Sequence, residues 1–531
     1  MSNKESMGQT TNTFETTEQL QARCESLEQE NAKLADKVKW LEAQFRLSQQ
    51  RQFAASSEKS DPNQLSLFNE AESTADLETE EPTVEEVTVR RKKRRGNRNV
   101  QTENLPRETI EHRLPETDQV CSCCGGALHE MSTETREEIK IVPAQAKVVD
   151  HVQYVYACRH CEHHEIETPI VPAQKPEPVY PGSLASPSAM AYIMNQKYVE
   201  GLPLYRQEKQ LNRLGVALSR QTMANWMIHG ADQWLQPIYG RMSDHLLEQD
   251  ILHADETTLQ VLSEPDRPAT AKSYMWMYRT GREGPPNILY DYQPSRASKH
   301  PCNFLSGFTG YLHVDGYAGY NKLPDVTLVG CWAHARRKFD EALKGLPTSK
   351  KDADVTAKEG LGFCNKLFKI ERDLKEVTSG ERYQCRLKRS QPVLDAFSSW
   401  LDKQAVNALP KSALGKAVNY CQKQWEKLTA FMEDGRLEID NNRGERSIKP
   451  FVIGRKNFLF SNTPKGAQSS AIIYSIVETA KENGLKPFDY LTYLFERLPN
   501  LDTKDKETLD QLLPWSLALP DSCRIPNQQS K

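Results

Sequence analysis

Three acidic residues in this sequence have the types and surroundings of divalent-metal ligands. Asp255 follows the apolar run ILHA and Asp315 follows the similar run YLHV, so each is expected at the end of a hydrophobic strand. A charge in such a place is costly to bury unless a partner compensates it. The third acid, Glu445, lies in the polar segment DNNRGERSIKP. Carboxylates that meet in space can hold two Mg²⁺ ions, or Mn²⁺, and such a pair of ions catalyses displacement at phosphodiesters.

The segment around the first two acids has the strand pattern of an α/β domain. ILHADE, SYMWMYRT and NILYDY are predicted as three strands, GYLHVD as a fourth and VTLVGCWA as a fifth, with a helix over 295–305. This order is expected of a ribonuclease-H-like sheet over 250–480, whose first and fourth strands are neighbours. Asp255 and Asp315 would then meet, and Glu445 would come from a helix capped by Asn441 or Asn442. The alternative is that the two aspartates are solvated strand ends.

A mostly helical stretch, 339–436, lies between the second and third acids. It is predicted as an insertion in the catalytic fold, with Trp400 and Trp425 in its core. Just before it, Cys331 and His334 are expected to position DNA or the active site, or simply to pack, because two ligands do not complete a metal site. Candidate phosphate ligands flank the acids, although helix salt bridges are the alternative for some of them: Arg336, Arg337, Lys449, Arg455 and Lys456.

Two CxxC pairs predict a zinc ribbon over 115–168. Each pair places two thiolates on one tight turn, and four thiolates close a tetrahedral site with no open position. A structural Zn²⁺ ion is therefore expected on Cys121, Cys124, Cys158 and Cys161. A redox role is the weaker alternative, because no thioredoxin-like pattern surrounds the pairs.

The N-terminal part combines a coiled-coil pattern with a charged linker. Leucines recur every seven residues over 16–48, and a single Asn among the facing positions favours a parallel dimer. A helix packed on its own domain is the alternative. Residues 54–98 are predicted to be disordered, first acidic and then basic. The basic block suits phosphate contacts, although solvated linker charge is the alternative; it includes Arg91, Lys92, Lys93, Arg94 and Arg95.

Helical patterns precede and follow the α/β segment. Within the helical region 189–245, one helix is predicted to run to Leu214, Gly215 to form a turn, and Ser219 to cap a second helix. This shape is typical of a helix-turn-helix with Arg220 and Gln221 facing DNA, and a plain helical hairpin is equally compatible. Two amphipathic helices broken at 484–487 lead into a small C-terminal region, 485–523. The tail after Pro520 is expected to be flexible.

The totals predict a multidomain intracellular protein. At 531 residues, three or four domains are expected. The twelve cysteines do not form a disulfide framework, which favours a reducing compartment. The first residues lack an apolar signal core, and no run of about eighteen apolar residues predicts a membrane span. We therefore expect a cytoplasmic, nucleoid-associated protein.

The ordered motifs resemble those of the insertion-sequence-66 transposases, the large DDE-type proteins of those elements. The similarity covers nearly the whole chain, through LPLYRQE, HADET, VDGYAGYN, CWAHARRKF and DNNRGERSIKP. It implies that Asp255, Asp315 and Glu445 are the catalytic triad, and it supports the four cysteines as zinc ligands. Glu445 is preferred over Glu438 and Asp440 because it matches the acid of the family.

The expected function is therefore DNA transposition. The protein would bind terminal inverted repeats, pair two ends as a homodimer or higher oligomer, cut with metal-activated water and join the 3′-OH to target DNA. Companion proteins of the same element are plausible partners. Two rivals stay open: a zinc-ribbon DNA-binding regulator without chemistry, and a ribonuclease-H-like nuclease that cuts without joining.

Overall fold

The computed structural model describes residues 145–157, 170–345 and 355–526, with a few isolated positions before them. The chain divides into two units, and the unit described below contains residues 153–524. The basic block at 91–95 and the four cysteines of the predicted ribbon lie outside the described residues. Described positions of the predicted coiled coil are helical, and Leu27, Leu34 and Val38 are each about half exposed.

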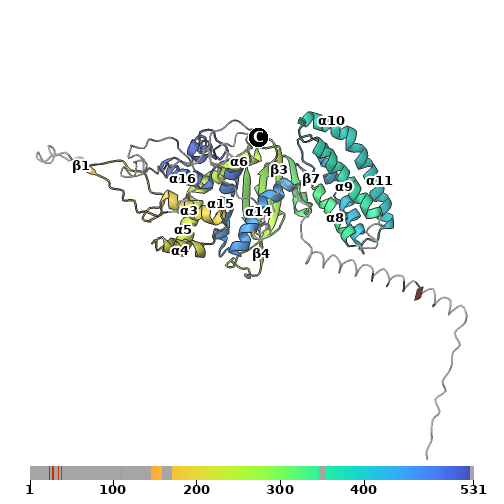
Figure 1. Ribbon diagram of the computed structural model, residues 1–531, viewed down its shortest axis with the longest axis horizontal. Helices are drawn as coiled ribbons and strands as arrows, with labels where there is room; N and C mark the ends of the chain where they lie inside the picture. Colours follow the sequence, from red (N-terminus) through yellow and green to blue (C-terminus); the bar gives the residue numbers. More distant parts are fainter. Residues whose placement is uncertain are drawn as a thin grey trace, which may run out of the picture. The chain divides into compact units, whose positions relative to one another are not determined.

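A five-stranded mixed sheet carries the first two acids (Figure 1). Its strands are β3 (Ile251–Gln260), β4 (Lys272–Thr280), β5 (Ile288–Gln293), β6 (Gly310–Val314) and β7 (Val326–Gly330). They lie in the order β5-β4-β3-β6-β7. Strands β3, β4 and β5 are antiparallel, whereas β6 and β7 run parallel to β3. The prediction that the strand of Asp255 lies beside the strand of Asp315 is confirmed.

Helices pack against the strands of the sheet. Helix α14 (Asn442–Phe458) packs on β3 and β4, and α15 (Pro464–Glu482) packs on β5. Residues 288–292 of β5 are consequently all buried, which explains why this strand is a nearly continuous apolar and aromatic run. The short helix α7 (Lys299–Phe304) stacks Phe304 on Tyr278 of β4. The 3-10 turn η5 (Ala318–Lys322) follows β6.

The helical region before the sheet shares the core of the sheet. It comprises α3 (Pro187–Tyr198), α4 (Leu204–Arg213), α5 (Arg220–His229), the π-helix η4 (Gly230–Leu235) and α6 (Gln236–Leu247). Gly215 has φ +83, a left-handed conformation that glycine adopts without strain. The Ser219 hydroxyl accepts a hydrogen bond from the Thr222 backbone at 3.1 Å, so Ser219 caps α5 as predicted. The turn between α4 and α5 therefore has the predicted residues.

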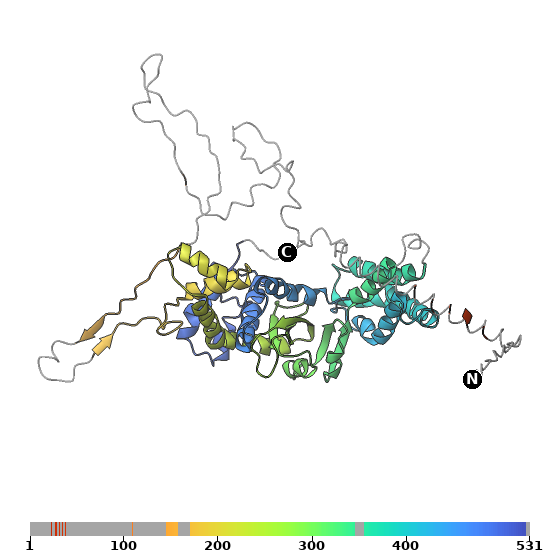
Figure 2. The same cartoon turned by 90° about the horizontal axis from the view of Figure 1, so that it is seen from below.

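The stretch between the second and third acids forms a helical body with its own core. It contains α8 (Trp332–Lys344), α9 (Val355–Asp373), α10 (Ser379–Arg389), α11 (Gln391–Asn407), α12 (Ala413–Lys423), α13 (Trp425–Thr429) and η7 (Ala430–Met432). Trp332, Phe339 and Phe397 are fully buried in this core, while Trp400 and Trp425 are only partly buried at its edge. In Figure 2 these cyan helices lie at one end of the unit and the yellow helices at the other.

The C-terminal helices correct two predictions. Helix α15 is not amphipathic, because residues 471–480 are all buried between β5 on one side and α3, α5, α6 and η4 on the other. The segment after Pro520 is ordered to Arg524: Lys486 N–H donates to Cys523 O at 2.8 Å, and Leu485 forms a bridge with Arg524. The remaining elements are α16 (Pro487–Arg497), η8 (Leu498–Asn500), α17 (Lys506–Asp510), η9 (Asp521–Cys523) and the hairpin β1 (Val155–Ala157) with β2 (Ile170–Pro172).

Candidate active site

The three predicted acids come from three neighbouring elements. Asp315 directly follows β6, as predicted, and Glu445 lies in the first turn of α14. The prediction that Asp255 ends its strand is wrong, because β3 continues to Gln260 through its pairing with β4. The parallel register pairs His253 with His313, so the two aspartates occupy equivalent positions two residues further along adjacent strands. Helix α14 packs against β3, which brings its first turn to the same part of the sheet. The topology therefore gathers all three carboxylates.

Burial and neighbouring negative charges both act on Asp255. Burial raises the pKa of Asp255 well above its ordinary value, and the negative charges of Glu256, Asp315 and Glu445 raise it further. The Glu256 N–H, which donates to Asp255 Oδ1 at 2.8 Å, opposes this shift. The Oε1 atom of Glu445 is buried and has no hydrogen-bond partner. Clustered carboxylates with an unsatisfied oxygen form a donor set that fits a hard divalent cation such as Mg²⁺ or Mn²⁺.

A fourth carboxylate, Glu256, is already engaged by the protein. Its side chain is almost fully buried, forms an ion pair with Arg296 and accepts a hydrogen bond from Tyr320 at 2.7 Å. The Arg296 guanidinium also lies 3.8 Å from the ring centre of Tyr317. The Tyr317 N–H in turn donates to Asp315 Oδ1 at 2.9 Å. Glu256 therefore braces the loop that carries Asp315.

A buried polar network next to the acids was not predicted from the sequence. The rings of His253 and His313 stack with centres 4.2 Å apart and are fully buried. His253 Nδ1 lies 2.8 Å from Asn441 Oδ1, and its Nε2 lies 3.2 Å from Glu438 Oε2. Burial lowers the pKa of His253, and the nearby Glu438 carboxylate opposes that shift. Arg443 donates twice to Glu438, each time at 2.9 Å.

This network joins the strand of Asp255 to the helix of Glu445. The Asn441 amide donates to Ala254 O at 2.9 Å, and Asn441 O accepts the backbone N–H of Glu445 at 3.0 Å. Asn441 is the N-terminal cap residue of α14, as predicted, but its side chain binds β3 and does not cap the helix. The signal that could have revealed the network is the repeat of Leu-His-X-Asp in the two strands, LHAD and LHVD.

Cys331 and His334 lie beside the third acid. The ligand atoms of Cys331, His334 and Glu445 are all within 4.8 Å of one another. His334 Nε2 is 3.8 Å from Glu445 Oε1, and an Arg337 nitrogen is 4.0 Å from Glu445 Oε2. Cys331 and His334 are therefore not an isolated pair of ligands, because α14 contributes Glu445 as a third.

The other predicted phosphate ligands have different surroundings. Arg336 donates to Asn365 at 2.8 Å, and the Arg455 guanidinium contacts Thr257 and Thr258 of β3. Lys449 is partly buried one turn after Glu445, and Lys456 is exposed near the end of α14. Arg220 and Gln221 are exposed at the N-terminus of α5. The cation nearest the acids among these candidates is thus Arg337.

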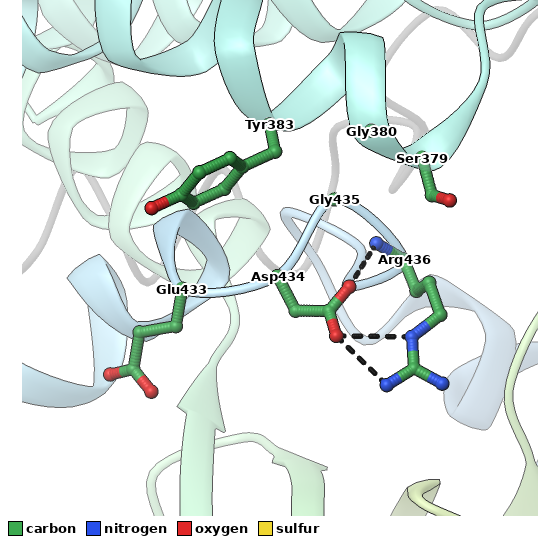
Figure 3. Close-up of a pocket in the computed structure, with 7 residues that line it drawn as sticks. All are labelled: Ser379, Gly380, Tyr383, Glu433, Asp434, Gly435 and Arg436. Atoms are coloured by element: carbon green, nitrogen blue, oxygen red, sulfur yellow. Dashed lines mark hydrogen bonds and ion pairs between the residues drawn. The ribbon is translucent and has the colours of Figure 1, made fainter.

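A surface pocket elsewhere in the unit does not include the acids. It is lined by Ser379, Gly380, Tyr383, Glu433, Asp434, Gly435 and Arg436 (Figure 3). Arg436 is paired with Asp434 at 2.9 Å and with Asp250 at 2.8 Å. Glu433 accepts a hydrogen bond from Tyr311 at 3.2 Å. Its charged groups already have partners, so this pocket is not the candidate site.

Within residues 145–157, 170–345 and 355–526, no helix has the length and apolar composition needed to cross a bilayer.

Four family models match successive parts of the chain. The transposase IS66 family model matches residues 182–469, which include the three acids. The zinc-finger binding domain of transposase IS66 matches 118–162 and spans the four cysteines. The IS66 C-terminal element matches 475–515. The model described as transposase C of IS166 homeodomain matches 40–110, which overlaps the end of the predicted coiled coil and covers the basic block.

Similar chains come from Sinorhizobium fredii (strain NBRC 101917 / NGR234). The uncharacterized protein y4jD is 32% identical over 429 residues, which are 78% of this chain and 80% of that protein. The uncharacterized protein y4qI is 30% identical over 431 residues, covering 78% and 76% of the two chains. Because the principal family model matches more than half of the sequence, this chain belongs to the IS66 family of DDE-type transposases.

Proposed function

We propose that this transposase binds the terminal inverted repeats of its element, cleaves DNA at those ends and joins the freed 3′-OH to target DNA. The observation that carries this proposal is the meeting of Asp255 and Asp315 on adjacent parallel strands with Glu445 from α14. The same arrangement supports a ribonuclease-H-like classification of the catalytic sheet. Metal-dependent phosphoryl transfer is the chemistry that such a carboxylate cluster serves.

Asp255, Asp315 and Glu445 would hold Mg²⁺ or Mn²⁺. Two such ions, when bound, supply activation of an attacking oxygen and charge stabilisation of the leaving oxygen. The protein itself sets the positions of the carboxylates. Asn441 fixes the start of α14 relative to β3, and Glu256 with Arg296 braces the loop of Asp315. Arg337, beside Glu445, is about half exposed and can contact a phosphate of the bound DNA.

DNA recognition is assigned to the N-terminal modules. Arg220 and Gln221 are exposed at the start of α5, where a recognition helix presents its base-contacting residues. The basic block Arg91–Arg95 would contribute phosphate contacts whose affinity falls with salt. Structural Zn²⁺ on Cys121, Cys124, Cys158 and Cys161 would hold the ribbon, and the coiled coil would pair two protomers and thus two DNA ends.

The test is metal-dependent cleavage and joining by the full-length protein. Labelled inverted-repeat DNA and a plasmid target are incubated with the protein in Mg²⁺ or in EDTA. Asp315→Asn is compared with the matched control Asp325→Asn. Asp325 is exposed and has φ 54, a conformation that asparagine tolerates equally well.

We expect wild type and Asp325→Asn to cut and join only with Mg²⁺, while Asp315→Asn binds the ends and does neither. Cutting without joining would favour a nuclease. Equal activity of Asp315→Asn and wild type would refute the assignment of the acids. Binding without cleavage by every protein, in Mg²⁺ or Mn²⁺, would favour a regulator or require a companion protein.

A further inference from the structure

We propose that Cys331, His334 and Glu445 form a second metal site, which takes a thiophilic divalent ion such as Zn²⁺. Their ligand atoms lie within 4.8 Å of one another. A thiolate, an imidazole and a carboxylate are ligands that Zn²⁺ accepts together, with water in the fourth position. Mg²⁺ selects oxygen ligands and would not choose this sulfur-containing set.

The first turn of α8 brings Cys331 and His334 together. Cys331 is the cap residue at the start of the helix, and the His334 N–H donates to Cys331 O at 3.2 Å. The segment before α14 is fastened to the same turn. Trp332 N–H donates to Ile439 O at 3.1 Å, and Asn441 N–H donates to Cys331 Sγ at 3.3 Å. These backbone contacts hold the first turn of α14, and with it Glu445, beside the pair.

An unsatisfied carboxylate oxygen faces His334. Glu445 Oε1 is buried without a hydrogen-bond partner. The 3.8 Å between His334 Nε2 and Glu445 Oε1 is too long for a hydrogen bond but close to the separation of two ligands on one zinc ion. An ion between the two side chains would give Glu445 Oε1 the partner that the protein does not supply.

The thiol can become a ligand at this position. Burial raises the pKa of Cys331 to about 12, so the metal-free side chain is a thiol. The Asn441 N–H and the helix N-terminus favour the thiolate once a cation is present. Formation of the metal–sulfur bond then releases the thiol proton to solvent. Arg337 opposes cation binding, but it lies on the other oxygen of Glu445.

Glu445 would be shared between this site and the proposed catalytic one. A Zn²⁺ ion held by Cys331 and His334 would therefore draw Glu445 away from the two aspartates. Zinc inhibition of the Mg²⁺-dependent reaction follows, and this consequence rests on the proposed function. Metal binding itself does not, since it can be measured without DNA.

Co²⁺ absorption tests the binding site directly. The full-length protein, with its predicted ribbon kept loaded with Zn²⁺, is titrated with Co²⁺ in Mg²⁺ buffer, and the sulfur-to-cobalt charge-transfer band is recorded. The variants are Cys331→Ser, His334→Ala and the double variant Cys121→Ser/Cys124→Ser. Cys385→Ser is the matched control, because Cys385 is a partly buried free cysteine in α10. Circular dichroism melting verifies that each variant folds.

We expect a saturable band in wild type, in Cys385→Ser and in the ribbon variant. The band should be absent from Cys331→Ser, and His334→Ala should bind Co²⁺ at least ten times more weakly. A band that survives Cys331→Ser, or no saturable band in wild type, would overturn the proposal.

End cleavage in added Zn²⁺ then tests the shared acid. The cleavage rate of each protein is compared with its own rate without added Zn²⁺. Half-inhibition of Cys331→Ser should need at least a tenfold higher Zn²⁺ concentration than half-inhibition of Cys385→Ser. A cobalt band with the expected variant pattern but equal zinc inhibition would confirm the site and refute only the sharing of Glu445 with catalysis.

Discussion

Replacement of Asn441 by alanine tests whether the buried network positions Glu445. The Asn441 side chain is fully buried and makes two hydrogen bonds, at 2.9 Å to Ala254 O and at 2.8 Å to His253 Nδ1. Each bond lost leaves a buried polar group unsatisfied, at a cost of about 1–3 kcal/mol. Asn441→Ala should therefore lower the free energy of unfolding by about 2–6 kcal/mol.

The same change should reduce activity in protein that is still folded. Asn441 ties the residue before Asp255 to the turn that carries Glu445, so its loss frees the two acids to move apart. A displacement of about 1 Å at an active site can cost about 100-fold in rate. We expect end cleavage to fall at least tenfold at a temperature where the variant is folded.

The assay combines urea unfolding followed by tryptophan fluorescence with end cleavage in Mg²⁺. Asn442→Ala is the matched control, because the adjacent Asn442 side chain is partly buried and donates to Asp440 at 2.7 Å. This control should lose no more than about 1 kcal/mol, the net value of one hydrogen bond. If the two variants unfold within about 0.5 kcal/mol of each other and cleave equally, the network does not position the acids.

Three further perturbations follow from the structure. Asp255→Asn should raise the melting temperature at pH 7 in Mg²⁺-free buffer. The pKa of Asp255 is raised in the folded state, so wild type loses stability as pH rises from the ordinary pKa of about 3.9 through the folded-state pKa. A melting temperature that differs between variant and wild type by the same amount from pH 4 to 8 would contradict this. Arg386→Ala should destabilise the insertion by about 3–5 kcal/mol, because its fully buried guanidinium binds Glu371 at 2.8 and 2.7 Å. Limited proteolysis should therefore cut this variant within residues 355–432, whereas the control Arg389→Ala, whose ion pair with Asp373 is exposed, should resist cleavage there. Arg220→Ala should weaken DNA-end binding and, if Arg220 contacts a phosphate, reduce the slope of log affinity against log salt by about 1, measured by fluorescence anisotropy.

The strands were predictable because their residue patterns are local. Alternation and apolar runs identify β3 to β7, and the order of these strands places Asp255 beside Asp315. The environment of a helix is not local. Helix α15 has polar residues such as Ser475 and Thr479 that suggest an exposed face, yet both are buried. Their hydroxyls can be buried because they accept hydrogen bonds from the backbone of β5. Tertiary partners therefore overrode the amphipathic interpretation.

For the site, the sequence alone determined which acids are candidates, through Leu-His-X-Asp in two predicted strands and a third acid that matches the family. Only the tertiary structure decided what surrounds them. Cys331 and His334 meet Glu445 although more than 100 residues separate them in the chain, because the hydrogen bonds from Trp332 N–H to Ile439 O and from Asn441 N–H to Cys331 Sγ fasten α8 to the segment before α14. Contacts between residues so far apart in the chain depend on how helices and strands pack together, and this packing cannot be inferred from the spacing of residues in the sequence.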